Sequence, residues 1–101
     1  MVSKNDAQPP FKFYYQAAAA ADVVVKGQPG YLEGIIIGAD VGSSVIEISD
    51  SATDGDGDVK IYLSGSTLHS TAGGFLPIRC EFENGITADL TNQTNCTFIY
   101  K

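Results

Sequence analysis

Apolar and polar side chains alternate along much of the chain with a period of two, which is the pattern of strands that bury one face. In residues 45–50, Ile46 and Ile48 fall on one face, and in residues 75–82 every even-numbered position is apolar. The segments that we expect to form strands are residues 11–15, 23–25, 31–38, 45–50, 59–63, 75–82, 86–90 and 96–100. The pattern therefore predicts a protein built from strands.

Turn signals separate these segments at intervals of roughly 8 to 12 residues. Residues 26–30 place a proline before a glycine, as in a type II turn, and Asn84-Gly85 is a frequent hairpin dipeptide, so we expect hairpins at both places. Short strands with such turns predict an all-β fold, an antiparallel β-sandwich or a jelly-roll-like barrel of seven to eight strands.

Three stretches carry more specific expectations. The five alanines at residues 17–21 are too few for an independent helix, and we expect a strand with small side chains there. Residues 35–37 are apolar on both faces, as in a central strand that is covered on both sides. In the segment 59–63, the residues expected to point inward are Val59, Ile61 and Leu63.

The length of 101 residues, with 44% hydrophobic side chains, allows one domain with a single core. Residues 1–10 lack apolar periodicity and end in two prolines, so we expect an extended arm at the start of the chain. We place the N-terminal arm at residues 1–16 and the β-sandwich domain at residues 17–101.

Composition supports strands and disfavours two classes of partner. The chain contains seven Val, nine Ile and seven Thr against five Leu and one Met. Its net charge of -6 disfavours binding to nucleic acid or to an anionic membrane surface. No apolar run approaches the roughly 20 residues that span a bilayer, and the polar start predicts a soluble protein without an export signal. Charged residues make up 18%, below the usual share, so we expect part of the surface to be an interface.

One acidic loop has the character of a calcium site. Asp54, Asp56 and Asp58 alternate with glycines, and carboxylates on a glycine-rich loop can converge on a hard cation. The calcium-loop pattern then fails, because Val59 stands at the sixth position and Gly65 at the twelfth. The loop is therefore either a solvated turn or a weak Ca²⁺ site, and we expect no other cofactor.

The remaining reactive side chains form no catalytic motif. His69 is the one histidine and no Gly-x-Ser-x-Gly motif is present, so we expect an ordinary loop histidine. Cys80 and Cys96 can form one disulfide, but without an export signal we expect free thiols. The sequence thus gives no catalytic residue, and we expect a protein that is not an enzyme.

Four aromatic residues next to the arm allow two roles. Such side chains can fill the end of a small core, or they can anchor a partner surface. The candidate partner-binding residues are Phe11, Phe13, Tyr14 and Tyr15. Because a chain of this size leaves apolar surface uncovered, we also expect a homo-oligomer.

Several turn and strand patterns together resemble a known family. They are Val-Val-Val-Lys-Gly-Gln-Pro-Gly-Tyr-Leu at residues 23–32 before the isoleucines at 35–37, Val-Lys-Ile-Tyr at 59–62, Asn-Gly-Ile at 84–86 and Thr-Phe-Ile-Tyr at 97–100. Over residues 20–100 the layout resembles small all-β virion proteins of tailed bacteriophages, which decorate or cement the capsid.

This resemblance implies a non-enzymatic β-sandwich, often trimeric, on the capsid surface of the virion. It would bind the major capsid protein at capsomer junctions and stabilise the phage head. Deletion of residues 1–15 is then expected to weaken binding to the particle without unfolding the domain.

Two other functions fit the same sequence. A β-sandwich with exposed aromatic residues and a loop suited to Ca²⁺ also fits a carbohydrate-binding module, although the chain has no Trp, the usual stacking residue. A phage tail or neck component would have the same layout. Binding to glycans, to capsids or to tails separates the three functions.

Overall fold

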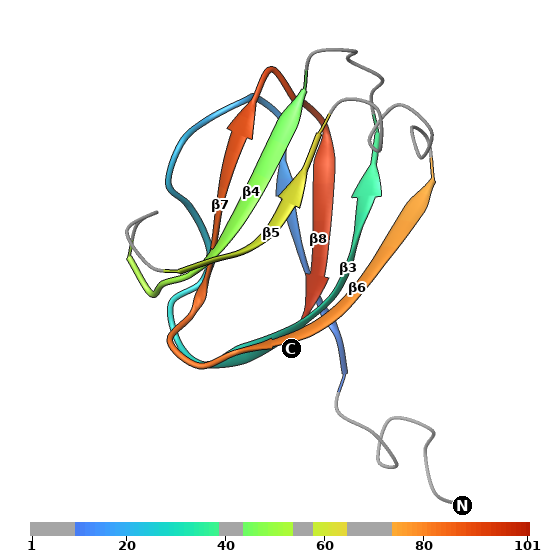
Figure 1. Ribbon diagram of the computed structural model, residues 1–101. Helices are drawn as coiled ribbons and strands as arrows, with labels where there is room; N and C mark the ends of the chain where they lie inside the picture. Colours follow the sequence, from blue (N-terminus) through green and yellow to red (C-terminus); the bar gives the residue numbers. More distant parts are fainter. Residues whose placement is uncertain (1–9, 39–43, 54–57, 65–73) are drawn as a thin grey trace, which may run out of the picture.

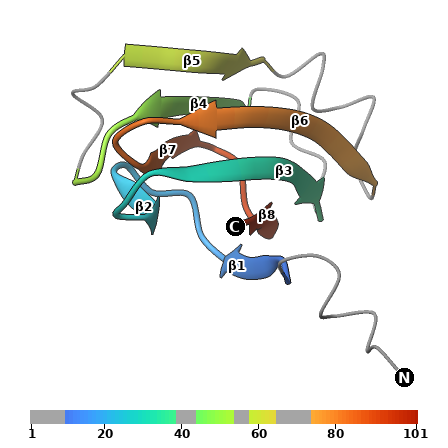
Figure 2. The same cartoon turned by 90° about the horizontal axis from the view of Figure 1, so that it is seen from below.

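Two antiparallel sheets pack face to face in the computed structural model, which describes residues 10–38, 44–53, 58–64 and 74–101 (Figure 1, Figure 2). These residues form eight strands and no helix. The strands are β1 (Lys12–Gln16), β2 (Val23–Lys26), β3 (Gly30–Ile37), β4 (Val45–Asp50), β5 (Asp58–Leu63), β6 (Phe75–Phe82), β7 (Ile86–Thr91) and β8 (Cys96–Tyr100). Sheet A has the order β1-β8-β3-β6, and sheet B has the order β2-β7-β4-β5.

Each strand in the first half of the chain pairs with one in the second half, and the four pairs are nested around the β4–β5 hairpin. β4 pairs with β5, β3 with β6, β2 with β7 and β1 with β8, and successive pairs alternate between sheet B and sheet A. A two-stranded ribbon that folds at the β4–β5 hairpin and then wraps around a core has this connectivity, which is that of a jelly roll. The predicted all-β fold is confirmed as a two-sheet sandwich with jelly-roll connectivity.

Two turns that were expected to close hairpins carry the chain from one sheet to the other. Residues 26–30 join β2 in sheet B to β3 in sheet A, and Asn84-Gly85 joins β6 in sheet A to β7 in sheet B. The prediction of hairpins is wrong at both places, because a turn dipeptide specifies a reversal and not the sheet that receives the next strand. The two turns lie against each other, since a Cβ on Gly85 would meet the Lys26 carbonyl oxygen at 2.8 Å.

The core lies between the sheets and takes the apolar face of each strand. Ile46 and Ile48 are fully buried, as the alternation in β4 predicts. In β6 the even-numbered residues also face inward: Ile78 and Cys80 pack against the core and Phe82 is buried. Alternation within these strands is therefore confirmed.

β5 departs from its predicted alternation at its start. Ile61 and Leu63 pack against the core as expected, but Val59 is 50% exposed. Lys60 is an extra residue of β5, so the register between β4 and β5 shifts there. Such an extra residue bends its strand, and the side chains next to it no longer alternate regularly between the two faces. The inward assignment of Val59 is wrong for this reason.

β3 lies inside sheet A between β8 and β6, as expected of a central strand. Its faces are not both covered, however, because Ile35 and Ile37 are fully buried while Ile36 is 37% exposed. No described layer covers the outer face of sheet A. The prediction of a strand buried on both sides is therefore wrong, and the apolar outer residue needs another explanation.

The alanine segment forms no strand. It links β1 in sheet A to β2 in sheet B, where Ala17 accepts a hydrogen bond from the Asn95 N–H at 3.1 Å and Ala20 accepts one from the Leu90 N–H at 2.8 Å. Alanine gives a strand little side chain to pack, and the chain must cross between the sheets at this point. The expectation of a strand with small side chains is wrong here.

β1 belongs to sheet A, although its residues fall in the range assigned to the arm. Its five residues pair with β8, from Lys12 with Tyr100 to Gln16 with Cys96. The sandwich therefore begins at Lys12 rather than at residue 17, and a deletion of residues 1–15 would remove most of a strand. Residues 1–9 lie outside the described residues.

Asp50 ties the end of β4 to the crossing between β6 and β7. Its carboxylate accepts hydrogen bonds from the backbone N–H groups of Glu83 at 3.1 Å, Asn84 at 2.7 Å and Gly85 at 3.3 Å. Burial of the carboxyl works to raise its pKa, but these hydrogen bonds and the charge of Lys60 outweigh it and hold the pKa of Asp50 below its ordinary value. The carboxylate thus satisfies N–H groups in a turn that strand pairing does not reach.

Candidate functional site

The outer face of sheet A carries an apolar surface that spans all four strands. Two neighbouring rows of side chains run across β1, β8, β3 and β6 in that order. The rows are Phe13, Ile99, Gly34 and Pro77, then Tyr15, Thr97, Ile36 and Phe75. We call these eight residues the apolar platform.

The platform leaves large apolar side chains in water. Phe13 is 65% exposed, Tyr15 59%, Phe75 42% and Ile36 37%. Single exposed apolar residues are ordinary, but a contiguous group without a charged side chain among them is typical of a binding surface. The platform is therefore the candidate functional site.

Charged groups border the platform at one end. The Lys101 ammonium lies 4.8 Å from the centre of the Phe11 ring, and Arg79 Nε lies 3.5 Å from a carboxylate oxygen of Glu33. Glu81 follows the platform residues of β6 on the same face. An aromatic, apolar centre with a charged rim is typical of a protein interface.

Gly34 determines where the Phe75 ring lies. A Cβ at position 34 would stand 2.4 Å from two atoms of that ring and 2.6 Å from the Leu76 carbonyl oxygen. The ring therefore lies directly against the backbone of β3, where a glycine leaves the space. This contact places Phe75 at the middle of sheet A although β6 is an edge strand.

The outer face of sheet B is different in character. Glu47 of β4 and Asp89 of β7 stand directly opposite each other, and Tyr62 of β5 is the partner of Glu47 on the other side. Adjacent like charges in register repel each other and favour contact with water. The two outer faces thus differ, since one is apolar and the other carries paired carboxylates.

Of the four aromatic residues expected to bind a partner, the structure places two on the platform. Phe13 and Tyr15 point outward, and the Tyr15 hydroxyl donates to Asn95 Oδ1 at 2.5 Å. Tyr14 packs against the core, and Phe11 precedes β1 at the rim. The cluster is divided between the two faces of sheet A, because successive side chains of a strand point to opposite faces. Tyr14 fills the core, and partner binding by the exposed aromatic residues stays a prediction.

The sequence prediction missed the platform residues of the other three strands. They are Gly34, Ile36, Phe75, Pro77, Thr97 and Ile99. The alternation in residues 75–82 places the odd positions on the outer face, so two of these residues could have been found from the sequence. Nothing in the alternation shows that β3, β6 and β8 form one sheet with β1.

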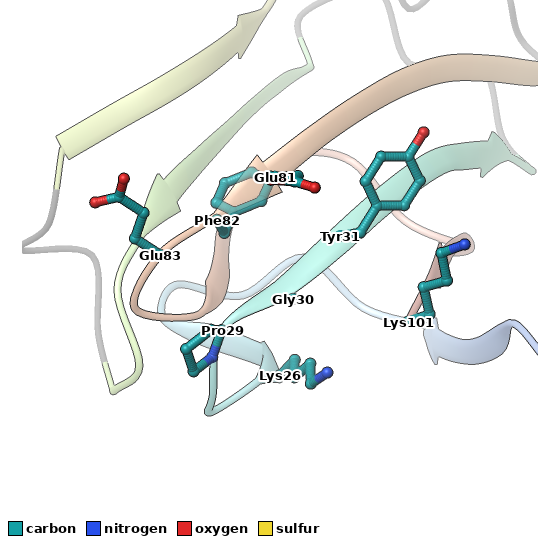
Figure 3. Close-up of a pocket in the computed structure, with 8 residues that line it drawn as sticks. All are labelled: Lys26, Pro29, Gly30, Tyr31, Glu81, Phe82, Glu83 and Lys101. Carbon is teal, nitrogen blue, oxygen red and sulfur yellow. The ribbon is translucent and has the colours of Figure 1, made fainter. Parts of the chain in front are cut away.

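An open pocket of about 320 Å³ lies where β3 begins and β6 ends (Figure 3). Lys26 and Lys101 lie on one side of β3 and Glu81 and Glu83 on the other. Equal numbers of ammonium and carboxylate groups give no preference for an anion or a cation, and the lining contains no nucleophile with an adjacent base. The pocket therefore indicates no particular chemistry.

The acidic loop lies mostly outside the described residues. Asp54 and Asp56 fall within residues 54–57, and His69 falls within 65–73, so the structure tests none of the three. Asp58 begins β5, where it is exposed and pairs with Asp50. Within the four described ranges, no three His, Cys, Asp or Glu side chains form a group that could hold a metal ion. The weak Ca²⁺ site stays a prediction.

The two cysteines are free thiols, as expected. Cys80 pairs with Leu32 and Cys96 with Ile37, so roughly 16 Å of strand separates them, beyond the reach of a disulfide. Burial raises the pKa of the Cys96 thiol to about 11, which keeps it protonated at neutral pH. Cys96 is therefore a small core side chain rather than a nucleophile or a metal ligand.

We expect a disulfide reagent such as DTNB to label one cysteine in the folded chain. Cys80 is partly exposed, whereas Cys96 is fully buried and protonated, so one equivalent should react quickly and the second only after unfolding. Absorbance of the released thiolate measures the reaction, and Cys80→Ser should abolish the fast equivalent. Two fast equivalents would contradict the burial of Cys96, and none would contradict the free state of Cys80.

The fold and the platform define a jelly-roll protein in which apolar side chains on the outer face of sheet A are exposed. The chain matches no protein-family model, no curated protein and no solved structure. In the described part of the chain, no helix has the length and apolar character needed to cross a membrane.

Proposed function

We propose that this chain is a non-enzymatic virion structural protein, a capsid decoration or cement protein that binds the shell of a phage head through the apolar platform. The observation that carries the proposal is the uncharged surface across the four strands of sheet A, with exposed aromatic side chains from β1 and β6. Jelly rolls are common among viral capsid domains, which supports the proposal by analogy at the level of the fold. The partner is the major capsid protein at capsomer junctions, in line with the resemblance over residues 20–100.

The platform suits the centre of such an interface. Aromatic side chains at the middle of a contact supply much of its binding energy, and a polar rim excludes water around them. Phe13, Tyr15 and Phe75 are the aromatic anchors, since each is more than two-fifths exposed before binding. Burial of an aromatic side chain is worth up to about 3 kcal/mol, and a capsid contact would recover part of that energy.

The charge of the chain suits the same orientation. With sheet A against the shell, Glu47 and Asp89 on the outer face of sheet B stay in water and lose no hydration. The net charge of -6 favours encounter with basic surface on the shell, and this long-range attraction weakens with added salt. The apolar face then supplies affinity and the charge supplies the rate of encounter.

Phe75→Lys is expected to weaken binding to phage heads by roughly 30-fold, because it places a charge in the apolar centre of the contact. Co-sedimentation of the chain with heads that lack it measures the affinity. Val59→Lys is the matched control, since Val59 is 50% exposed but lies on β5 of sheet B. Its affinity should stay near that of the wild-type chain.

Two outcomes of that experiment would overturn the proposal. Equal affinity of the two lysine variants would show that the platform is not the binding surface, and absence of wild-type binding to heads would remove the decoration role. Tails are sedimented separately, and binding to tails alone would identify a tail or neck component instead.

The same platform supports a second candidate function, carbohydrate binding. Lectin domains also use the jelly roll, and aromatic side chains exposed on a sheet face can stack on sugar rings. Retention on a glycan array that is lost in Tyr15→Ala, without binding to heads, would favour this function. Tyr15→Phe is the matched control, because it keeps the ring and removes only the hydroxyl that bonds Asn95.

A further inference from the structure

In the part of the chain that the structure describes, four strands form the edges of the two sheets, and three of these edges are interrupted. β2 and β5 each have a register irregularity, at Val25 and at Lys60. β6 is interrupted in three ways. It contains Pro77, which has no N–H, and Arg79, whose φ is 55°. In addition, the Lys60 ammonium donates to the Glu81 carbonyl oxygen at 3.2 Å. Bulges, prolines and lysines of this kind stop an edge strand from pairing with another chain.

β1 has none of these interruptions. It pairs with β8 in unbroken register over all five residues, and its sequence Lys-Phe-Tyr-Tyr-Gln contains no proline or glycine. Its lysine stands at the first position rather than in the middle. Within the described ranges no strand lies on its other side, so β1 presents a regular open edge.

The hydrogen bonds of β8 show which backbone groups of β1 face this open edge. Lys101 and Tyr31 exchange two N–H···O bonds of 2.9 and 2.7 Å, so the odd-numbered residues of this part of the chain turn their N–H and C=O groups toward β3. The even-numbered residues 96, 98 and 100 therefore bond to their even-numbered partners in β1. Phe13 and Tyr15 consequently direct their N–H and C=O groups to the open edge.

We propose that two copies of this chain pair through β1, antiparallel, about a two-fold axis at Tyr14. Phe13 then stands opposite Tyr15 of the second copy, and each such pair exchanges two N–H···O bonds. The rings of the pair lie side by side on the outer face, as favourable cross-strand aromatic neighbours. Lys12 meets Gln16 of the second copy, so no like charges face each other.

The second copy is the occupant because this register is self-complementary. A two-fold contact uses the same strand on both sides, and here all five residues of β1 find a partner without a clash of charge. The result is one sheet in which the two apolar platforms are continuous. The contact closes at two copies, so it does not build the trimer that the resemblance implies. This inference does not depend on the proposed function.

Size-exclusion chromatography with light scattering on the full chain tests the pairing. We expect the wild-type mass to rise to twice the monomer mass across a concentration series, and Phe13→Pro to remain monomeric with an unchanged circular dichroism spectrum. The proline removes an N–H that faces the open edge and none that bonds to β8. Phe13→Ala is the matched control, because it removes the ring but keeps the N–H, and it should still dimerise more strongly than Phe13→Pro.

A cross-linking experiment tests the register even if Phe13→Pro does not fold. Two variants are made in a Cys80→Ser background, one with Phe13→Cys and one with Tyr15→Cys. Mild oxidation of their mixture should form a disulfide-linked dimer between the two variants. Each variant oxidised alone should form less of a linked dimer. A wild-type monomer at every concentration, a trimer, or cross-linking that is no greater in the mixture than in each variant alone would overturn the proposal.

Discussion

Replacement of Phe98 by alanine is expected to destabilise the folded chain by about 3–5 kcal/mol. Among the described residues Phe98 is the largest fully buried side chain, and it stands between Tyr14 of β1 and Ile35 of β3 on the inner face of sheet A. The loss of unfolding free energy has two parts, which are the transfer free energy of the removed ring and the cost of the cavity that its removal leaves. Because domains are stable by only about 5–15 kcal/mol, urea denaturation will detect a large shift of the midpoint.

Phe75→Ala is the matched control for this prediction. It removes the same ring from the outer face of the same sheet, where Phe75 is already 42% exposed, and we expect a loss of less than about 1 kcal/mol. The comparison tests which face of sheet A is inside. A larger loss at Phe75 than at Phe98 would contradict that assignment and the platform with it.

Asp50→Ala is expected to destabilise the chain by about 3 kcal/mol. The substitution leaves three buried or half-buried N–H groups, those of Glu83, Asn84 and Gly85, without their acceptor. Replacement of a fully solvated aspartate would lower the unfolding free energy much less than this. Asp58→Ala is the control, since Asp58 is exposed at the start of β5 and should cost little.

The contribution of Asp50 is also expected to depend on pH. Its pKa in the folded chain is lowered from the ordinary value of 3.8, so its stabilising effect is complete above that value and is lost as the pH falls through the lower folded pKa. The difference in unfolding free energy between the wild-type chain and Asp50→Asn should therefore shrink in acid. A difference that stays constant on both sides of pH 3.8 would contradict the role of the carboxylate.

The strands could be predicted from the sequence because the alternation of apolar and polar residues within a strand shows which of its side chains are buried. Ile46 and Ile48 share a face in the alternation and are both buried, and residues 96–100 form a strand as expected. The connections could not be predicted in the same way. Asn84-Gly85 specifies a reversal, but whether the chain returns to the same sheet depends on pairing between segments that are far apart in the sequence.

Part of the candidate site was predictable for a related reason. Phe13 and Tyr15 stand out because aromatic residues cluster next to the arm, and the structure places both on the outer face. For Ile36 the apolar run predicts instead a strand that is covered on both sides. In the structure Ile36 pairs with Phe75 and Thr97, and only the sheet order shows that these side chains form one surface.

Cryo-electron microscopy of phage heads saturated with the chain tests whether the platform binds the shell. We expect density for the sandwich at capsomer junctions, with the platform of sheet A against the shell and the Glu47–Asp89 face of sheet B toward solvent. Density with sheet B against the shell, or heads that carry no density for the chain at all, would contradict it.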